Sequence, residues 1–125
     1  MQTPLLSICI PTYNRAEYLE KSLDSLVNQE NFSQIEVVIS DNASTDTTSE
    51  VCRKFTEQYP NIFYHRNEEN IHDRNFPAVL MKAHGVFRKL YNDNFIHLQG
   101  SIKYTLLLIE KYRKIKPFLF FYKVG

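Results

Sequence analysis

The chain has 125 residues, of which 15 are Lys or Arg and 14 are Asp or Glu, so its formal net charge is +1. This balance argues against a nucleic-acid partner, and the length is sufficient for one domain with its own hydrophobic core. Cys9 and Cys52 fall in apolar patterns, which predicts buried free thiols rather than a disulfide. The sequence shows neither a secretory signal nor an apolar run near the roughly 18 residues that span a bilayer. We therefore expect a cytoplasmic protein.

Apolar strand patterns alternate with helical patterns along the chain, which is typical of α/β proteins. In chain order, the predicted elements are a strand at 6–10, a helix at 15–28, a strand at 35–39, a helix that ends before Pro60, a strand at 61–65, a helix from Asn75, a strand at 86–91, a helix at 101–114 and a strand at 117–122. Asn14 and Glu17 have the spacing of a capping box for the first helix, and Ser44 or Thr45 can cap the second. Gly85 is expected to cap the end of the third.

Polar clusters follow two of the predicted strands directly. The strand at 6–10 leads into Pro-Thr-Tyr-Asn-Arg at 11–15, and the strand at 35–39 leads to Asp-Asn-Ala-Ser-Thr-Asp at 41–46. Ligands of open α/β sheets bind at the carboxyl ends of parallel strands, where loops diverge and helix N-termini offer unpaired N–H groups. The first interpretation is therefore a nucleotide site at this edge of the sheet.

Several enzyme classes lack their sequence signals in this chain. Its three glycines begin only at Gly85, so no Gly-rich phosphate loop can follow the first strand, which disfavours ATPases and nicotinamide enzymes. The four histidines have no metal-ligand spacing, and no Gly-Xaa-Ser-Xaa-Gly motif occurs. Metallohydrolases and serine hydrolases are therefore disfavoured as well.

The two strand-end clusters together resemble the N-terminal half of the inverting family 2 glycosyltransferases, which carry both motifs in this order. A third segment agrees, because the strand at 86–91 leads to Asn92-Asp93-Asn94, where the family usually carries an Asp-Xaa-Asp or Asp-Asp metal motif. The resemblance covers residues 5–123. It implies a three-layer α/β/α domain of the nucleotide-diphospho-sugar transferase (GT-A) fold with a mainly parallel sheet. It also implies sugar transfer from a nucleotide sugar to a bacterial surface glycan or a lipid-linked acceptor.

The resemblance implies a set of nucleotide-binding residues, namely Pro11, Thr12, Tyr13, Arg15, Asp41, Asn70, Arg74 and Asn92. By this resemblance, Asp41 is expected to accept a hydrogen bond from the imide N–H of a uracil-type base, which favours a uridine diphosphate sugar. Tyr13 can stack on the base, and the planar fork of Arg74 suits phosphate. Other interpretations remain open: Asp41 as a turn residue, Tyr13 in packing, Arg15 as a solvated helix residue and Asn75 as either helix cap or ligand.

Asp93 is the predicted metal ligand, and the expected cofactor is Mg²⁺ or Mn²⁺. Loss of a nucleoside diphosphate benefits from a hard cation on the leaving oxygens, and such a cation often takes only one or two protein carboxylates. The chain departs from the family here, because Asn92 and Asn94 stand where further acidic residues are common. A polar turn at the end of a strand is the alternative interpretation.

In the family, the general base is an Asp or Glu beyond the last strand predicted here, in an acceptor-binding half. We therefore expect a single donor-binding domain, apparently truncated, without the acceptor half. The basic residues Lys111, Arg113, Lys114 and Lys116 either contact a membrane surface peripherally or end a solvated helix.

Two other functions stay open. One is a non-catalytic nucleotide-sugar-binding or protein-interaction domain that keeps the fold. The other is a phosphoacceptor domain of flavodoxin-like fold, which would need an acidic pair where Pro11 and Thr12 stand.

Overall fold

The computed structural model describes residues 3–113 and 122–123. Its sheet has the strand order β3-β2-β1-β4-β5. The strands are β1 (Leu6–Thr12), β2 (Glu36–Asp41), β3 (Ile62–Arg66), β4 (Phe87–Leu90) and β5 (Tyr122–Lys123). The first four run parallel, and β5 is antiparallel to β4. The chain builds outward from β1 through β2 and β3 and then returns to the other side of β1 for β4, so the topological switch point lies between β1 and β4.

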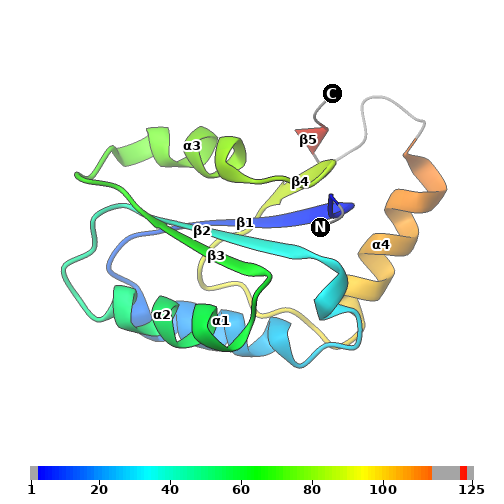
Figure 1. Ribbon diagram of the computed structural model, residues 1–125, viewed down its shortest axis with the longest axis horizontal. Helices are drawn as coiled ribbons and strands as arrows, with labels where there is room; N and C mark the ends of the chain where they lie inside the picture. Colours follow the sequence, from blue (N-terminus) through cyan, green and yellow to red (C-terminus); the bar gives the residue numbers. More distant parts are fainter. Residues whose placement is uncertain (1–2, 114–121, 124–125) are drawn as a thin grey trace.

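Helices cover both faces of the sheet, as Figure 1 shows. The helices are α1 (Ala16–Val27), α2 (Thr48–Gln58), α3 (Asn75–Lys82) and α4 (Ser101–Tyr112). Apolar side chains of α1, α2 and α4 join one core cluster with β1 and β2, whereas Val79 of α3 packs with Cys9 and Val38 on the opposite face. The predicted three-layer α/β/α architecture with a mainly parallel sheet is therefore confirmed.

The burial of β2 and of α1 follows from their positions in the fold. Every residue of β2 is buried, as expected for a parallel strand covered by helices on both faces. Its centre, 37–39, is a short apolar run, and the polar residues Glu36, Ser40 and Asp41 lie at its two ends. On α1, Leu19, Leu23 and Leu26 are fully buried at helical spacing. Each of these side chains contributes about 1.5–3 kcal/mol through burial.

The predicted capping box of α1 is wrong. Its N-cap residue is Arg15, which makes no side-chain capping bond. Asn14 instead has a φ of 49°, and its Oδ1 accepts hydrogen bonds from the backbone N–H of Thr45 at 2.7 Å and of Asp46 at 3.3 Å. Because Asn tolerates the left-handed region, it can turn the chain and bond the neighbouring loop at once.

Neither Ser44 nor Thr45 caps α2, which begins at Thr48. The N-cap residue is Thr47, which makes no side-chain capping bond. Asp46, just before it, bonds the helix start instead: its Oδ1 accepts from the Thr48 N–H at 3.0 Å while its Oδ2 accepts from the Ala16 N–H of α1 at 3.2 Å. One carboxylate therefore serves the N-termini of two helices, and the two loops that follow β1 and β2 are held together.

Gly85 does not cap α3, whose C-cap is Ala83. Its backbone lies against β1, where an added Cβ would be 2.4 Å from Ser7 Oγ and 2.8 Å from Ser7 N. The Gly85 N–H donates to Ser7 Oγ at 2.8 Å, and Ser7 Oγ donates to Glu36 Oε1 at 2.8 Å. This glycine is therefore required for the approach of β4 to β1. Most of the last predicted strand, 117–122, lies outside the described residues.

Candidate functional site

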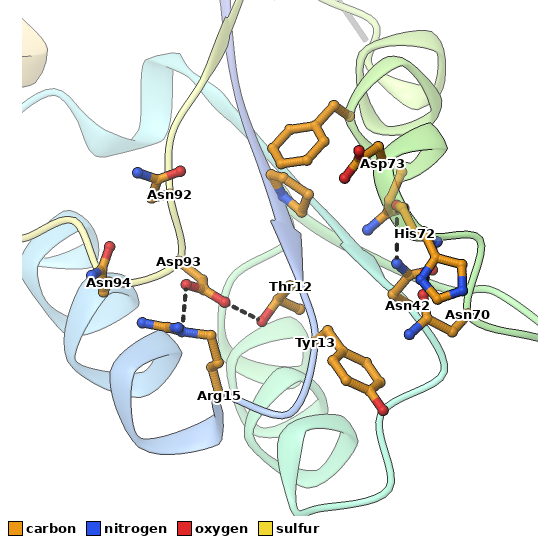
Figure 2. Close-up of a pocket in the computed structure, with 13 residues that line it drawn as sticks. Thr12, Tyr13, Arg15, Asn42, Asn70, His72, Asp73, Asn92, Asp93 and Asn94 are labelled. Carbon is orange, nitrogen blue, oxygen red and sulfur yellow. Dashed lines mark hydrogen bonds and ion pairs between the residues drawn. The ribbon is translucent and has the colours of Figure 1, made fainter.

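A pocket of about 440 Å³ opens where β1, β2 and β4 end (Figure 2). Seven of the nine predicted nucleotide and metal residues line it: Pro11, Thr12, Tyr13, Arg15, Asn70, Asn92 and Asp93. The position follows from topology, because loops on either side of a switch point diverge and leave a crevice at the carboxyl ends of the strands.

Asp93 joins the two loops that flank this switch point. Its Oδ2 accepts a hydrogen bond from Thr12 Oγ1 at 2.8 Å, and its Oδ1 lies 3.0 Å from Arg15 Nε, as Figure 2 shows. The residue is 7% exposed. Burial raises the pKa of the Asp93 carboxyl, and the Thr12 hydrogen bond and the Arg15 charge offset only part of that shift. The carboxylate is thus held in place at the edge of the pocket.

A metal ion at this site would have few protein ligands. Among residues 3–113 and 122–123, no group of three or more His, Cys, Asp or Glu side chains is arranged to hold a cation. Asp93 supplies one carboxylate, and Asn92 and Asn94 place amide groups on the same rim of the pocket. Mg²⁺ commonly binds through one or two carboxylates and completes its shell with phosphate oxygens and water, so this sparse set fits a cation that arrives with a diphosphate.

The opposite wall of the pocket was largely missed by sequence reasoning. Besides Asn70, it contains residues for which no binding role had been predicted, namely Asn42, His72, Asp73 and Phe76. Asn42 is buried, accepts from the Ile71 N–H at 2.8 Å and donates to the His72 carbonyl at 3.3 Å. Its place directly after Asp41, inside the same strand-end motif, was the available signal.

Asn75 was predicted to be either helix cap or ligand, and the structure gives it a third role. The N-cap of α3 is Arg74, and Asn75 is the first helical residue. Asn75 is buried, accepts from Ser40 Oγ at 2.7 Å and donates to the Ser40 carbonyl at 2.8 Å. These two hydrogen bonds tie the start of α3 to the end of β2, and Asn75 also lines the pocket there.

Asp41 and Arg74 are not among the residues that line the pocket. Asp41 is fully buried, and its carboxylate accepts from the Ser44 N–H at 2.9 Å and from the Tyr64 hydroxyl at 2.6 Å. It therefore orders the turn after β2, and its contact with a base stays a prediction. Arg74 is exposed at the start of α3, and its contact with phosphate also stays a prediction.

The predicted basic surface is only partly within the described residues. Arg113 pairs with Glu110 at 3.2 Å and lies over the Phe87 ring, with its guanidinium carbon 5.9 Å from the ring centroid. Lys111 lies near the Tyr112 ring, whereas Lys114 and Lys116 lie outside the described residues. In the described part of the chain, no helix has the length and apolar character needed to cross a membrane.

Two curated relatives share most of this chain. Abequosyltransferase RfbV of Salmonella typhimurium is 52% identical over 111 residues, which cover 86% of this chain and 32% of the relative. The uncharacterized glycosyltransferase MG060 of Mycoplasma genitalium is 43% identical over 129 residues, which cover 91% of this chain and 43% of the relative. The chain thus spans well under half the length of either protein.

Solved structures agree with the fold. The crystal structure of S. aureus TarS 1–349 in complex with UDP-GlcNAc superposes with a TM-score of 0.78 at 25% identity, over 86% of this chain and 32% of that one. Mannosyltransferase PcManGT from Pyrobaculum calidifontis, in complex with GDP-Man and Mn²⁺, has a TM-score of 0.74 at 23% identity, over 87% of this chain and 33% of that one. Residues 7–123 match the family described as Glycosyl transferase family 2. A match over nearly the whole chain, on the expected fold and with the expected pocket, shows that this chain belongs to glycosyl transferase family 2.

Proposed function

We propose that these residues form the sugar-donor half of a glycosyltransferase, which binds a nucleotide diphosphate sugar at the carboxyl ends of β1, β2 and β4. The observation that carries this proposal is the group of Thr12, Arg15 and Asp93, held at the switch point on the rim of a polar pocket. A carboxylate beside a guanidinium offers both a cation ligand and a positive partner for a diphosphate.

The pocket suggests how a nucleotide sugar would lie. Tyr13 is 45% exposed on the rim, so its ring face is available to stack on a base. Arg15 is held by Asp93 next to the space where a diphosphate would pass. A uridine nucleotide is favoured by the proposed contact of Asp41 with an imide N–H and by the UDP-GlcNAc bound to TarS.

We infer that the site takes Mg²⁺ or Mn²⁺ together with the diphosphate, with Asp93 as the protein carboxylate and Asn92 or Asn94 as candidate amide ligands. When bound, such a cation stabilises negative charge on the leaving diphosphate. The Mn²⁺ bound to PcManGT supports this proposal. The buried hydrogen bond from Thr12 would keep the Asp93 carboxylate aimed at the rim, so the protein contributes orientation more than ligand number.

The acceptor is proposed to be a bacterial surface glycan or a lipid-linked precursor of one, in the cytoplasm or at the inner face of the membrane. The 52% identity with an abequosyltransferase makes abequose the first sugar to test. A peripheral membrane contact through the basic end of α4 would suit a lipid-linked acceptor.

Calorimetric titration of UDP, CDP and GDP, each with and without Mn²⁺, tests the proposed function. We expect UDP to bind, and to bind more tightly with Mn²⁺ present. Asp41→Asn should weaken UDP binding by about 1.5–3 kcal/mol, the range for a hydrogen bond to a charged group.

Tyr64→Phe is the matched control. It removes the hydrogen bond that the Tyr64 hydroxyl donates to the Asp41 carboxylate and leaves the carboxylate itself in place. It should lower the free energy of unfolding by about 1 kcal/mol and leave the affinity for UDP unchanged. Absence of binding by every nucleotide would instead support the protein-interaction alternative. An equal loss of affinity in both variants would make Asp41 a turn residue only.

A further inference from the structure

A lysine lies beneath the far wall of the pocket and does not line it. Lys82, the last residue of α3, donates from Nζ to Ser40 Oγ at 2.9 Å and to Asn67 Oδ1 at 3.0 Å. Burial lowers the pKa of this ammonium group, in keeping with a charge held among neutral amide and hydroxyl groups. Within residues 3–113 and 122–123, both hydrogen bonds of the ammonium group go to neutral oxygens, and it forms no ion pair with a carboxylate.

The ammonium group determines which way the neighbouring amides point. Lysine can only donate, so the oxygen of the Asn67 amide faces Lys82, and the nitrogen must face the other way. That nitrogen donates to Asn75 Oδ1 at 3.0 Å and to Asn42 Oδ1 at 3.2 Å. Ser40 Oγ accepts from Lys82 and donates to the same Asn75 oxygen, so every hydrogen bond in the network has a consistent direction.

The direction is passed on to the pocket wall through Asn42. With its oxygen fixed by Asn67, Asn42 accepts from the Ile71 N–H at 2.8 Å and uses its own nitrogen to donate to the His72 carbonyl at 3.3 Å. The segment held in this way carries Asn70, His72 and Asp73, which line the pocket opposite Asp93 (Figure 2). His72 has a φ of 53°, in the left-handed region that residues other than glycine adopt infrequently, so contacts from the surroundings help to hold this segment.

We propose that Lys82 is a positioning residue of the sugar-donor pocket, which orients the amides of Asn67 and Asn42 and thereby holds residues 70–73 in place as the pocket wall. The consequence for ligand binding rests on the proposed function, whereas the effect on the wall itself does not. Fixed amide directions present residues 70–73 to the ligand in one arrangement, which lowers the entropy lost on binding.

Hydrogen–deuterium exchange at the Ile71 N–H is the direct test, since this amide bonds Asn42 and its exchange needs no nucleotide. Lys82→Met should raise the exchange rate of Ile71 about tenfold, through loss of the fixed acceptor. Asn67→Asp should have at least the same effect, because it keeps an acceptor for Lys82 but replaces the nitrogen that donates to Asn42 and Asn75. Lys82→Arg retains donors without an acceptor and should restore slow exchange.

Lys54→Met is the matched control, because it removes one positive charge from an exposed residue of α2 that pairs with Glu20 of α1 and does not contact the pocket. It should leave Ile71 exchange and UDP affinity unchanged. With Mn²⁺ present, Lys82→Met should weaken UDP binding about threefold to tenfold. Should Lys82→Met fail to fold, Asn67→Asp carries the same measurements.

Unchanged Ile71 exchange in both Lys82→Met and Asn67→Asp would overturn the positioning role, whatever their affinity for UDP. A fall in melting temperature without faster Ile71 exchange would also overturn it, since a merely structural lysine would act in that way. Faster exchange in a protein whose wild type binds no UDP would support the network and refute the proposed function.

Discussion

At the scale of single residues, the site depends on the carboxylate of Asp93, which is buried and already bonded to other protein side chains. Asp93 is 7% exposed and is held by Thr12 and Arg15, yet its pKa lies above the usual value because burial outweighs these contacts. The ionised form is therefore less favourable in the folded protein than in the unfolded chain. A bound cation would reverse this balance, because it favours the ionised carboxylate.

Asp93→Asn should separate stability from binding. The pKa of Asp93 is higher in the folded protein than in the unfolded chain, so its protonated form adds stability that is lost as the pH rises through the folded-state pKa. Asparagine resembles this protonated, neutral form. At pH 7 we expect the variant to melt no lower than the wild type, and the difference should vanish below pH 3.8, the usual value of the carboxyl. Mn²⁺ should no longer strengthen UDP binding. A lower melting temperature together with intact Mn²⁺ dependence would contradict this.

The sequence located most of these residues because they follow strands directly. Thr12 and Asp93 are 81 positions apart, but Thr12 ends β1 and Asp93 follows the end of the parallel neighbour β4, so their proximity could be predicted from topology. Lys82 could not be found in this way. Its partners Ser40 and Asn67 are 42 and 15 positions away, and its role comes from the side-chain directions of α3 and β2 in three dimensions.

At the scale of elements, the helices were predictable from the sequence, and the residues that cap them were not. Apolar spacing fixed α1, α2, α3 and α4 to within a few residues, since burial against the sheet enforces the 3.6-residue period. The capping-box prediction failed because Asn14 bonds the loop before α2 rather than its own helix, while Asp46 serves both α2 and the start of α1. Local capping rules cannot anticipate a partner 30 or more residues away.

Gly85 offers a test of the contact between β1 and β4. In Gly85→Ala the new Cβ would meet Ser7 Oγ at 2.4 Å and the Phe87 carbonyl oxygen at 3.0 Å, so the two strands must move apart. We expect a loss of about 1–3 kcal/mol in the free energy of unfolding, as for other overpacked cores. Chemical denaturation measures it.

Gly100→Ala is the control for that substitution. Gly100 has a φ of 86° but has no atom within 4 Å of an added Cβ, so only backbone strain of about 1 kcal/mol is expected. If Gly85→Ala were no more destabilising than Gly100→Ala, the close approach of the strands at Gly85 would not be what requires glycine there.

At the scale of the whole molecule, the carboxyl ends and the amino ends of the parallel strands have different roles: one end carries the pocket, and the other holds β4 in place. The carboxyl edge carries the pocket with Thr12, Asp93 and Asn42. The opposite edge carries buried Glu36, which accepts from Ser7 Oγ and from the His84 N–H, both at 2.8 Å, and so fastens the start of β4. Binding and fastening are thus separated along the strands, so variants at one edge should leave the other largely unaffected.

The last prediction concerns the reaction. Tested alone, the 125 residues should bind a nucleotide sugar and hydrolyse it slowly, without transfer to a glycan or lipid-linked acceptor. Inverting transfer benefits from a base at the acceptor oxygen. The acidic residues that line the pocket are Asp93, already engaged by Thr12 and Arg15, and exposed Asp73. The relatives named as glycosyltransferases are more than twice as long, so the acceptor contacts are expected in their further residues.

An assay of sugar-donor consumption that separates free sugar from transferred product tests this expectation. Asp93→Ala should abolish the slow hydrolysis, because assistance at the leaving diphosphate depends on the carboxylate and not on an acceptor. Asp73→Asn is the companion variant and should leave hydrolysis unchanged if Asp73 is not a base. Authentic transfer by the 125 residues, lost in Asp73→Asn, would place the acceptor site within these residues and make Asp73 the proton acceptor, against the division of the enzyme proposed here.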